Sequence, residues 1–489
     1  MNDQRAMIDA TMPSSTPATP WTAEAFEAFL SARREPKWLV AIRRAAWNAF
    51  ERLPPPDMTA EDWRRTDIRG LRLDRFGFSR GHAHDVDAPG ASVADAQRRA
   101  ADDGAGAAHR TIAQGGDGHA LRGSAGGGHV AGALAEGVDR AGQVVVVDGR
   151  SVEWRLDDAL RRRGVRFGPL DRLAAESEPW LRAQLEHPLV DPAADKFAAL
   201  AAAAWSSGVG LYVPPGVKIE RPLHVLLALS AGAADLSRAV VVLDQCAEAT
   251  LLCETRGLAG DAPALHCGIV ELAVGAGARL RAVHLQDWGD GTWHFAHQKA
   301  RLDRGAGLQW TLGALGARLA KVNQQVVLAA PDAEAQVNGV MFTEGRQHLS
   351  YHTHQHHEAP RCRSDLLYKG ALKDRSRIVW RGMIRVEPGA EKTDAYQRDD
   401  NLLLSADSRA DSIPGLEILA DDVKCSHGAT AGRVDDEVIF YAATRGLSRN
   451  EAVRMIVTGF FQQVFDRITI PGVRDALTTA IARRVRDID

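Results

Sequence analysis

A weak repeat, with a period of roughly thirty residues, runs through the chain between residues 209 and 441. In each repeat, a turn of small residues, which carries a glutamate in two of the four, precedes a short β-type run, at Ala247-Glu248-Ala249, Gly275-Ala276-Gly277-Ala278, Gly305-Ala306-Gly307 and Ala333-Glu334-Ala335. A single short unit cannot bury its inner face alone, so repeated units of this kind stack into a solenoid. The repeat favours a parallel β-helix, and an ordinary β-sandwich with glycine-rich turns is the alternative.

Helical patterns flank this β-rich region on both sides. Between residues 21 and 76, apolar residues recur at helical spacing, and Pro54-Pro55-Pro56 ends the second helix. Near the C-terminus, Ser448 and Glu451 form a capping box that opens another helix. Its predicted inner face comprises Ala452, Met455, Ile456, Phe460 and Val464. Pro471 begins a second amphipathic helix, and the pair is suited to capping the solenoid.

The chain divides into six segments on this basis. They are a polar N-terminus that we expect to be disordered (1–20), an N-terminal helical domain (21–80), a Gly/Ala/His-rich insert (81–142), a mixed α/β lead-in (143–206), the β-helix core (207–441) and a C-terminal helical domain (442–489). The insert has almost no large apolar side chains and cannot bury enough surface to offset its chain entropy. We therefore expect a flexible linker there.

Composition excludes several classes of function. The 60 basic and 63 acidic residues nearly cancel, so no net field favours nucleic acid or an anionic membrane. No apolar run is long enough to span a bilayer, and the N-terminus lacks the apolar core of a signal peptide. Five cysteines without finger-like spacing indicate reduced thiols and a cytoplasmic protein. Two of them, Cys246 and Cys253, fall in apolar runs and are predicted to lie in the core.

The sequence also lacks the common catalytic motifs. It contains no P-loop, no G-x-S-x-G, no H-E-x-x-H and no C-x₂-C-x₂-C run that would hold a stable cluster within one chain. We therefore predict a protein that is not an enzyme and that binds no nucleotide through a P-loop.

Cys425 and His427 are the strongest candidate metal ligands. They lie two residues apart after an alternating run typical of a strand, so their side chains share one face. A thiolate and an imidazole are donors that bind soft metals, but two ligands do not complete a tetrahedral site. A metal held there needs further donors from elsewhere. The competing interpretation is a small buried cysteine beside a surface histidine.

The residues around this pair form long motifs, which read Asn401-Leu402-Leu403-Leu404-Ser405, Pro414-Gly415-Leu416-Glu417-Ile418, Asp421-Asp422-Val423-Lys424-Cys425-Ser426-His427-Gly428-Ala429-Thr430 and Asp435-Asp436-Glu437-Val438-Ile439-Phe440-Tyr441. This sequence resembles the SufB/SufD family of iron–sulfur cluster assembly scaffolds, and within it the SufD branch. The resemblance is dense from about residue 369 to 461, weaker over 209–368, and reappears between residues 36 and 67. Motifs of this length are far more specific than an isolated pair of ligands.

The resemblance implies a mainly β protein, with a right-handed parallel β-helix core flanked by N-terminal and C-terminal α-helical domains. It implies a non-catalytic scaffold that acts in a SufB–SufC–SufD complex. A transient iron–sulfur cluster would be shared with a SufB-like subunit at the end of the β-helix, and this chain would bind no nucleotide. Without the SufB-like subunit, the alternative to this heterodimer is a homodimer of the chain.

Site residues follow from the same resemblance. His427 takes the position of a SufD histidine that faces the SufB assembly cysteine, and Cys425 is either a ligand or a packed neighbour. Ser408 stands where SufB has its cysteine, and a serine is a poor donor for a soft metal. The C-terminal helices would contact a SufC-like ABC ATPase, through Arg445, Met455, Ile456, Phe460, Phe461 and Val464.

A second group of histidines, His352, His354 and His356, alternates along one predicted strand. Flat strand geometry places the outer two roughly 13 Å apart, too far for one ion, so a polar outer ladder is favoured over an iron-entry site. The resemblance supports only His357 as a weaker candidate ligand. Two other hypotheses are a stand-alone homodimeric iron-binding protein and a β-helix enzyme acting on polysaccharides through carboxylates such as Asp394, Asp399 and Asp400.

Overall fold

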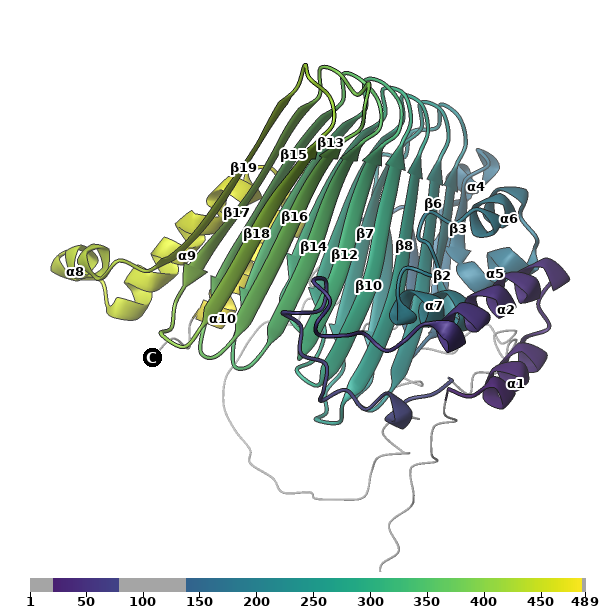
Figure 1. Ribbon diagram of the computed structural model, residues 1–489, viewed down its shortest axis with the longest axis horizontal. Helices are drawn as coiled ribbons and strands as arrows, with labels where there is room; N and C mark the ends of the chain where they lie inside the picture. The colour runs from purple at the N-terminus through teal and green to yellow at the C-terminus, as the bar shows by residue number, and fades with distance from the viewer. Residues whose placement is uncertain (1–20, 79–137, 486–489) are drawn as a thin grey trace, which may run out of the picture.

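The computed structural model describes residues 21–78 and 138–485 of the chain. The segment 1–20 and nearly all of the predicted insert at 81–142 lie outside the described residues. The described part is mainly β, with helices at both ends (Figure 1).

Two long sheets form the body of the molecule. The ten-stranded sheet runs in the order β19 (Lys424–Arg433), β17 (Asp394–Leu403), β15 (Arg363–Leu372), β13 (Glu334–Thr343), β11 (Gly307–Ala314), β9 (Arg279–Asp287), β7 (Glu248–Gly257), β5 (Leu223–Leu229), β1 (Gly142–Val147) and β2 (Arg150–Leu156). The nine-stranded sheet runs in the order β18 (Arg409–Ile418), β16 (Arg377–Val386), β14 (His348–His357), β12 (Leu319–Leu328), β10 (Thr292–Leu302), β8 (Ala264–Val274), β6 (Ala234–Leu243), β4 (Ser207–Val213) and β3 (Arg166–Pro169).

From β4 onward the chain alternates between the two sheets, and each strand pairs in parallel with the strand one turn away. Residues paired between adjacent turns are separated by 26 to 32 positions in the sequence. Trp293 and Leu319 give the shortest separation, and Arg377 and Arg409 give the longest. The architecture is a right-handed parallel β-helix of about eight turns. This confirms the β-helix and excludes the sandwich.

The small residues of the repeat lie at one corner of the coil. Ala247, Ala278, Ala306 and Ala333 immediately precede β7, β9, β11 and β13, and each is fully buried. A larger side chain there would have to displace the neighbouring turns, because protein interiors are close-packed. Between the sheets, large side chains such as Trp310 and Trp380 fill the lumen. Burial of apolar area, at about 25 cal/mol per Å², is what holds successive turns together.

Helices cover the N-terminal end. Helices α1 (Ala23–Arg33) and α2 (Lys37–Arg52) carry the predicted apolar stripe, and α2 packs against α7 (Lys196–Ala204), which lies on β6, β8 and β10. The remaining short elements of this end are η1 (Leu73–Arg75), α4 (Asp158–Arg162), α5 (Leu170–Ala175) and α6 (Pro179–Glu186).

The C-terminal helices are α8 (Asp436–Thr444), α9 (Arg449–Phe465) and α10 (Pro471–Val485). The predicted capping box between Ser448 and Glu451 is present at the start of α9. The predicted boundary at 442 is wrong, because the run that ends in Tyr441 is helical, and its first turn is capped by the Asp435 side chain.

Two further predictions fail. The buried face of α9 is Ala452, Val453, Val457, Phe461, Val464 and Phe465, so Met455 lies on the opposite, exposed side. Cys253 is buried as expected, but Cys246 is exposed in the turn before β7, where its φ of 56° is left-handed. The tight turn, rather than the apolar run around it, decides the place of Cys246.

Candidate metal-binding end of the β-helix

The C-terminal end of the β-helix is its open end. Strands β18 and β19 are the last members of their sheets, so each has one edge without a partner strand within the described residues. Inward residues of β16, such as Ile378, Trp380 and Ile384, are fully buried, whereas every residue of β18 is at least partly exposed. Unpaired edges and an uncovered inner face are surfaces suited to a second protein.

Cys425 and His427 lie on the inward face of β19. Cys425 pairs in register with Ala395, and His427 pairs with Gln397; both of these β17 residues are buried in the lumen. Because side chains alternate along a strand, Cys425 and His427 point to the same side, as predicted. They therefore lie at the C-terminal end of the lumen, in the turn that follows the last fully enclosed turn of the β-helix.

The two donors differ in their exposure to solvent. Cys425 is half-buried and packs against the apolar cluster that contains Ile384, Val386 and Ala395. This burial raises the pKa of the Cys425 thiol, so the thiol form prevails at neutral pH. His427 is exposed. A metal ion would have to displace the thiol proton of Cys425, whereas the His427 imidazole is already open to solvent.

A buried polar network lies directly beneath this pair. The Asp399 carboxylate accepts hydrogen bonds from Asn401 Nδ2 at 2.6 Å and from Ser412 Oγ at 2.5 Å. Gln397 Nε2 donates to the Gly415 carbonyl at 3.0 Å. Burial raises the pKa of Asp399 to about 7. The network joins β17 to β18 across the lumen. The sequence signal was the alternation of Gln397, Asp399 and Asn401 along one strand.

His357 lies deeper in the lumen. It is fully buried, its Nε2 is 2.8 Å from Ser364 Oγ, and burial lowers its pKa to about 4. Ser364 occupies the same column as Ala395 and Cys425, two strands below the latter. Two strand spacings amount to roughly 10 Å, so the structure does not bring His357 to the Cys425 pair.

Ser408 occupies the far corner of the last turn. It precedes β18, and its hydroxyl donates to the Ser405 carbonyl at 2.7 Å. The turn at 419–423 connects the end of β18 to the start of β19. Ser408 lies before β18 and Cys425 lies at the start of β19, so the two residues are about one strand length apart. The position that marks the sister subunit's cysteine is therefore not part of the Cys425 pair within this chain.

The outer histidines of β14 form a ladder with polar partners. His352 contacts Lys321 Nζ, and His356 Nε2 is 2.8 Å from a Glu387 carboxylate oxygen. His354 stacks on His356 with 5.4 Å between ring centroids. Within residues 21–78 and 138–485, no group of three or more His, Cys, Asp or Glu side chains is placed to hold one metal ion.

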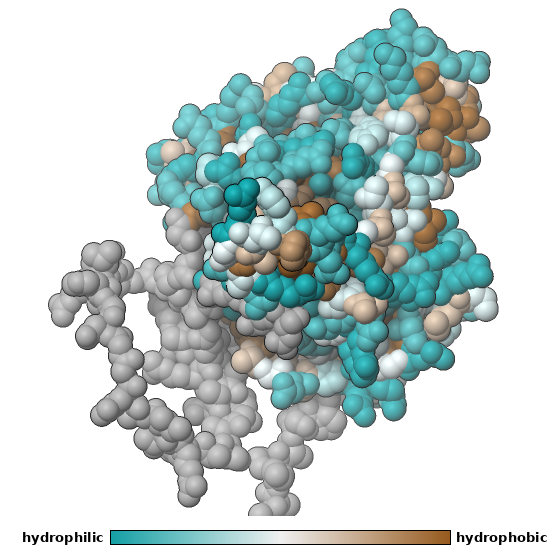
Figure 2. Space-filling view, turned by 90° about the vertical axis from the view of Figure 1, so that its left-hand side faces the viewer, coloured by the Kyte–Doolittle hydropathy of each residue, from teal (hydrophilic) through white to brown (hydrophobic). Residues whose placement is uncertain are grey.

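The C-terminal helices present an apolar surface, formed by Val438, Phe440, Tyr441 and Met455, with exposed fractions between 46% and 71%. Figure 2 looks onto this end of the molecule and shows hydrophobic atoms gathered among hydrophilic ones. Arg445 is also exposed, and it stacks on Tyr441.

Two residues of the predicted ATPase contact are not exposed in the folded chain. Phe461 and Val464 are fully buried, because they hold α9 against the β-helix. Ile456 and Phe460 are partly buried beside the same cluster, and Lys369 Nζ lies 4.6 Å from the Phe460 ring centroid.

The tryptophans of the β-helix core give no support to the polysaccharide hypothesis. Trp288, Trp293, Trp310 and Trp380 are all nearly or fully buried, so none offers an exposed ring face. Asp399 and Asp400 are buried as well. In the described part of the chain, no helix combines the length and apolar character needed to cross a membrane.

Comparisons with known proteins agree with this architecture. Residues 227–460 match the family model described as SUF system FeS cluster assembly, SufBD core domain. An iron–sulfur cluster assembly SufBD family protein of Mycobacterium leprae is 32% identical over 296 residues, which cover 59% of this chain and 74% of the relative. The corresponding protein of Mycobacterium tuberculosis is 31% identical over 296 residues, covering 59% and 73%.

A protein of Bacillus subtilis that is named iron–sulfur cluster assembly protein SufB is 27% identical over 325 residues, covering 66% of this chain and 69% of the relative. The region matched by the family model runs from within β5 through β19 to within α9, and thus contains the open end of the β-helix. The chain therefore belongs to the SufB/SufD family of iron–sulfur cluster assembly proteins.

Proposed function

We propose that this chain is a non-catalytic, SufD-like scaffold subunit for iron–sulfur cluster assembly. It acts with a SufB-like subunit and a SufC-like ABC ATPase, and the nascent cluster is cargo held at the interface with the SufB-like partner. Membership of the SufB/SufD family supports the role in cluster assembly. Ser408 in place of a cysteine supports the SufD-like assignment.

The observation that carries the proposal is the open end of the β-helix. Two donors, Cys425 and His427, lie on the inner face of a terminal strand whose outer edge is unpaired in the described chain. Iron in a cluster takes four ligands, of which cluster sulfides supply some and protein donors the rest. A partner that pairs with this edge would bring its own thiolates to the same place.

The ATPase contact is assigned to the exposed face of α8 and α9. Phe440 and Met455 are large apolar side chains that face solvent on these helices, a distribution typical of protein interfaces. Closure of an ATP-bound ATPase dimer would pull on these helices. Since α9 packs on β13 and β15, that pull would reach the last turns of the β-helix.

Co-expression tests the proposal. The chain is produced together with SufB-like and SufC-like proteins, and we expect one stable complex that contains all three and assembles a cluster. Recovery of the chain alone under these conditions would contradict the assignment.

Anaerobic iron titration of the isolated chain separates the proposal from a stand-alone homodimeric iron carrier. We expect weak, substoichiometric binding, because the pair at the open end offers only two donors. Tight stoichiometric binding to a homodimer would favour the carrier.

A further inference from the structure

A polar cavity of about 390 Å³ lies on the outer face of the nine-stranded sheet, away from the open end. Its floor is a row of four side chains in register across adjacent strands: His297, Asn323, His352 and Arg381. Trp63 and Asp62, from the segment that follows α2, form one wall, and Asp195 at the start of α7 forms another. The site therefore exists only where the N-terminal domain meets the β-helix.

Lys321 is the unusual residue of this cavity. It is only 2% exposed, and its Nζ lies 2.9 Å and 2.7 Å from the two ring nitrogens of His352 and 5.6 Å from the Trp63 ring centroid. Among the described residues, no carboxylate oxygen lies within ion-pair distance of this amine. Buried ammonium groups are normally paired, because removing a charge from water is costly.

The environment of Lys321 is set by its neighbours. Burial lowers the pKa of Lys321 to about 7, while the more distant carboxylates of Asp62 and Asp195 act in the opposite direction. Burial, together with the positive charges of Lys321 and Arg381, lowers the pKa of His352 to about 2, so His352 stays neutral. An uncompensated amine in a cleft is a feature of binding sites.

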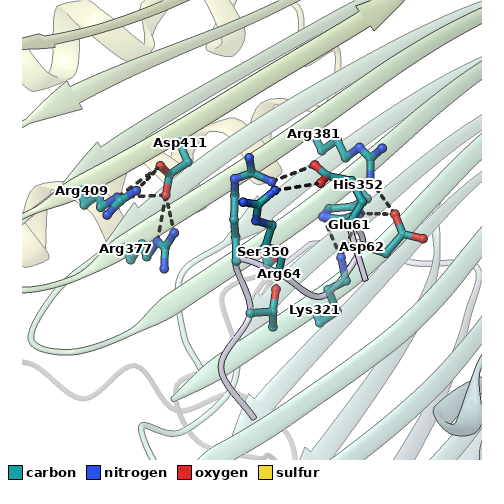
Figure 3. A network of polar contacts seen from close by, with 12 residues as sticks. Glu61, Asp62, Arg64, Lys321, Ser350, His352, Arg377, Arg381, Arg409 and Asp411 are labelled. Atoms are coloured by element: carbon teal, nitrogen blue, oxygen red, sulfur yellow. Dashed lines mark hydrogen bonds and ion pairs between the residues drawn. The ribbon is translucent and has the colours of Figure 1, made fainter. Parts of the chain in front are cut away.

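The nearby carboxylates have other partners. Asp195 accepts from the backbone of Phe197 and Ala198, and its second oxygen is 3.0 Å from His297 Nε2. Asp62 Oδ1 accepts from Arg381 Nη1 at 2.6 Å and lies 4.0 Å from His352 Nδ1, the atom that Lys321 also contacts (Figure 3). This oxygen marks where an anion can sit between the two cations. The Asp62 side chain is 71% exposed, so it can turn outward into solvent.

We propose that this cavity binds a small molecule bearing a phosphate group, whose oxygens pair with Lys321 and Arg381 in place of Asp62. A dianion matches two cations better than the single Asp62 carboxylate does, and a guanidinium suits the geometry of phosphate oxygens. The cavity exceeds the size of inorganic phosphate and leaves room for an organic group against Trp63. The inference concerns a different face from the open end and does not depend on the proposed function.

Calorimetric titration of the full chain with inorganic phosphate and with pyrophosphate, in chloride buffer, tests the site. We expect saturable binding, and at least about tenfold weaker binding in Lys321→Met, because this variant loses a charge-assisted hydrogen bond to the phosphate. Arg381→Gln should also weaken binding, and it provides a second variant if Lys321→Met does not fold. Asp62→Asn should strengthen binding, because it removes the competing carboxylate.

Lys299→Met is the matched control. Lys299 lies on the same face of β10 as His297, but it does not line the cavity. Its affinity for both probes should equal that of the parent chain. Absence of saturable binding to either probe, or equal affinity in folded Lys321→Met and Arg381→Gln, would overturn the proposal.

Discussion

At the scale of single residues, the open end combines an exposed metal donor, His427, with a partly buried one, Cys425. His427 reaches solvent, whereas Cys425 packs against Ala395 and its thiol has a raised pKa. In the proposed complex, the exposed imidazole would be open to iron held by the partner, whereas the partly buried thiol would become a ligand only after losing a proton. We therefore expect substitutions of His427 and of Cys425 to have different effects.

Replacement of His427 by alanine should leave folding and complex formation intact, because the side chain is exposed. Cluster transfer to an acceptor apoprotein should fall roughly tenfold or more, as for loss of a group that supports a metal site. The measurement is the rate of apoprotein activation by the reconstituted complex. His187→Ala, which removes an exposed histidine at the end of α6, is the control. Full transfer by the His427 variant would remove this residue from the mechanism.

Asp399 predicts a pH dependence of stability. Its folded pKa of about 7 exceeds the ordinary value of 3.8, so folding favours the protonated acid. The stabilisation is complete below about pH 4 and is lost as pH rises through 7, up to about 4 kcal/mol for this shift. Asp399→Asn, which cannot ionise, should gain in Tm relative to the parent between pH 4 and pH 8. A constant difference in Tm across this range would show that Asp399 stays ionised in the folded chain.

At the scale of elements, α9 serves two purposes on its two faces. The face with Val457 and Phe461 anchors the helix to the β-helix, and the face with Met455 is exposed beside α8. An amphipathic helix normally leaves its polar side to solvent, so the exposed Met455 of α9, together with the exposed Phe440 of α8, indicates a second contact surface.

Met455→Asp or Phe440→Asp should abolish binding of the SufC-like ATPase without unfolding the β-helix, because a buried charge at an interface is costly. Co-purification and circular dichroism measure the two effects. Thr479→Asp, at an exposed position of α10, should change neither. Retained ATPase binding by both apolar-to-acidic variants would refute the docking surface.

At the scale of the whole molecule, the β-helix is closed at one end and open at the other. Helices and the antiparallel strands β2 and β3 cover the N-terminal end, whereas β18 and β19 carry free edges in the described chain (Figure 1). The ends of a solenoid are its exposed surfaces, so the open end is where we expect the proposed partner to bind.

Hydrogen exchange should detect that partner. In the isolated chain, amides of β18 and β19 should exchange faster than those of β8 to β15, because their inner faces are exposed and one edge is unpaired. Addition of the SufB-like subunit should slow exchange in β18 and β19 and leave β8 to β15 unchanged. Equal protection of the terminal strands with and without the partner would place the interface elsewhere.

The sequence by itself determined the repeat, the capping box at Ser448 and the shared face of Cys425 and His427, because these follow from local spacing along the chain. Long motifs around Cys425 also indicated the family. Local spacing could not distinguish the two sides of α9, since apolar residues occur on both; packing against β13 and β15 buries Phe461 and leaves Met455 outside.

Only the tertiary structure decided which residues meet across turns. His357 and Cys425 are both residues that can bind metal, but His357 contacts Ser364, which lies two strands from Cys425 in the same column. Arg381 meets Asp62 only because the N-terminal segment crosses the outer face of the nine-stranded sheet. Such contacts depend on stacking register and domain docking, which sum over many residues far apart in the chain. The burial that raises the pKa of Asp399 and lowers that of Lys321 arises in the same way, because desolvation is a property of the assembled interior.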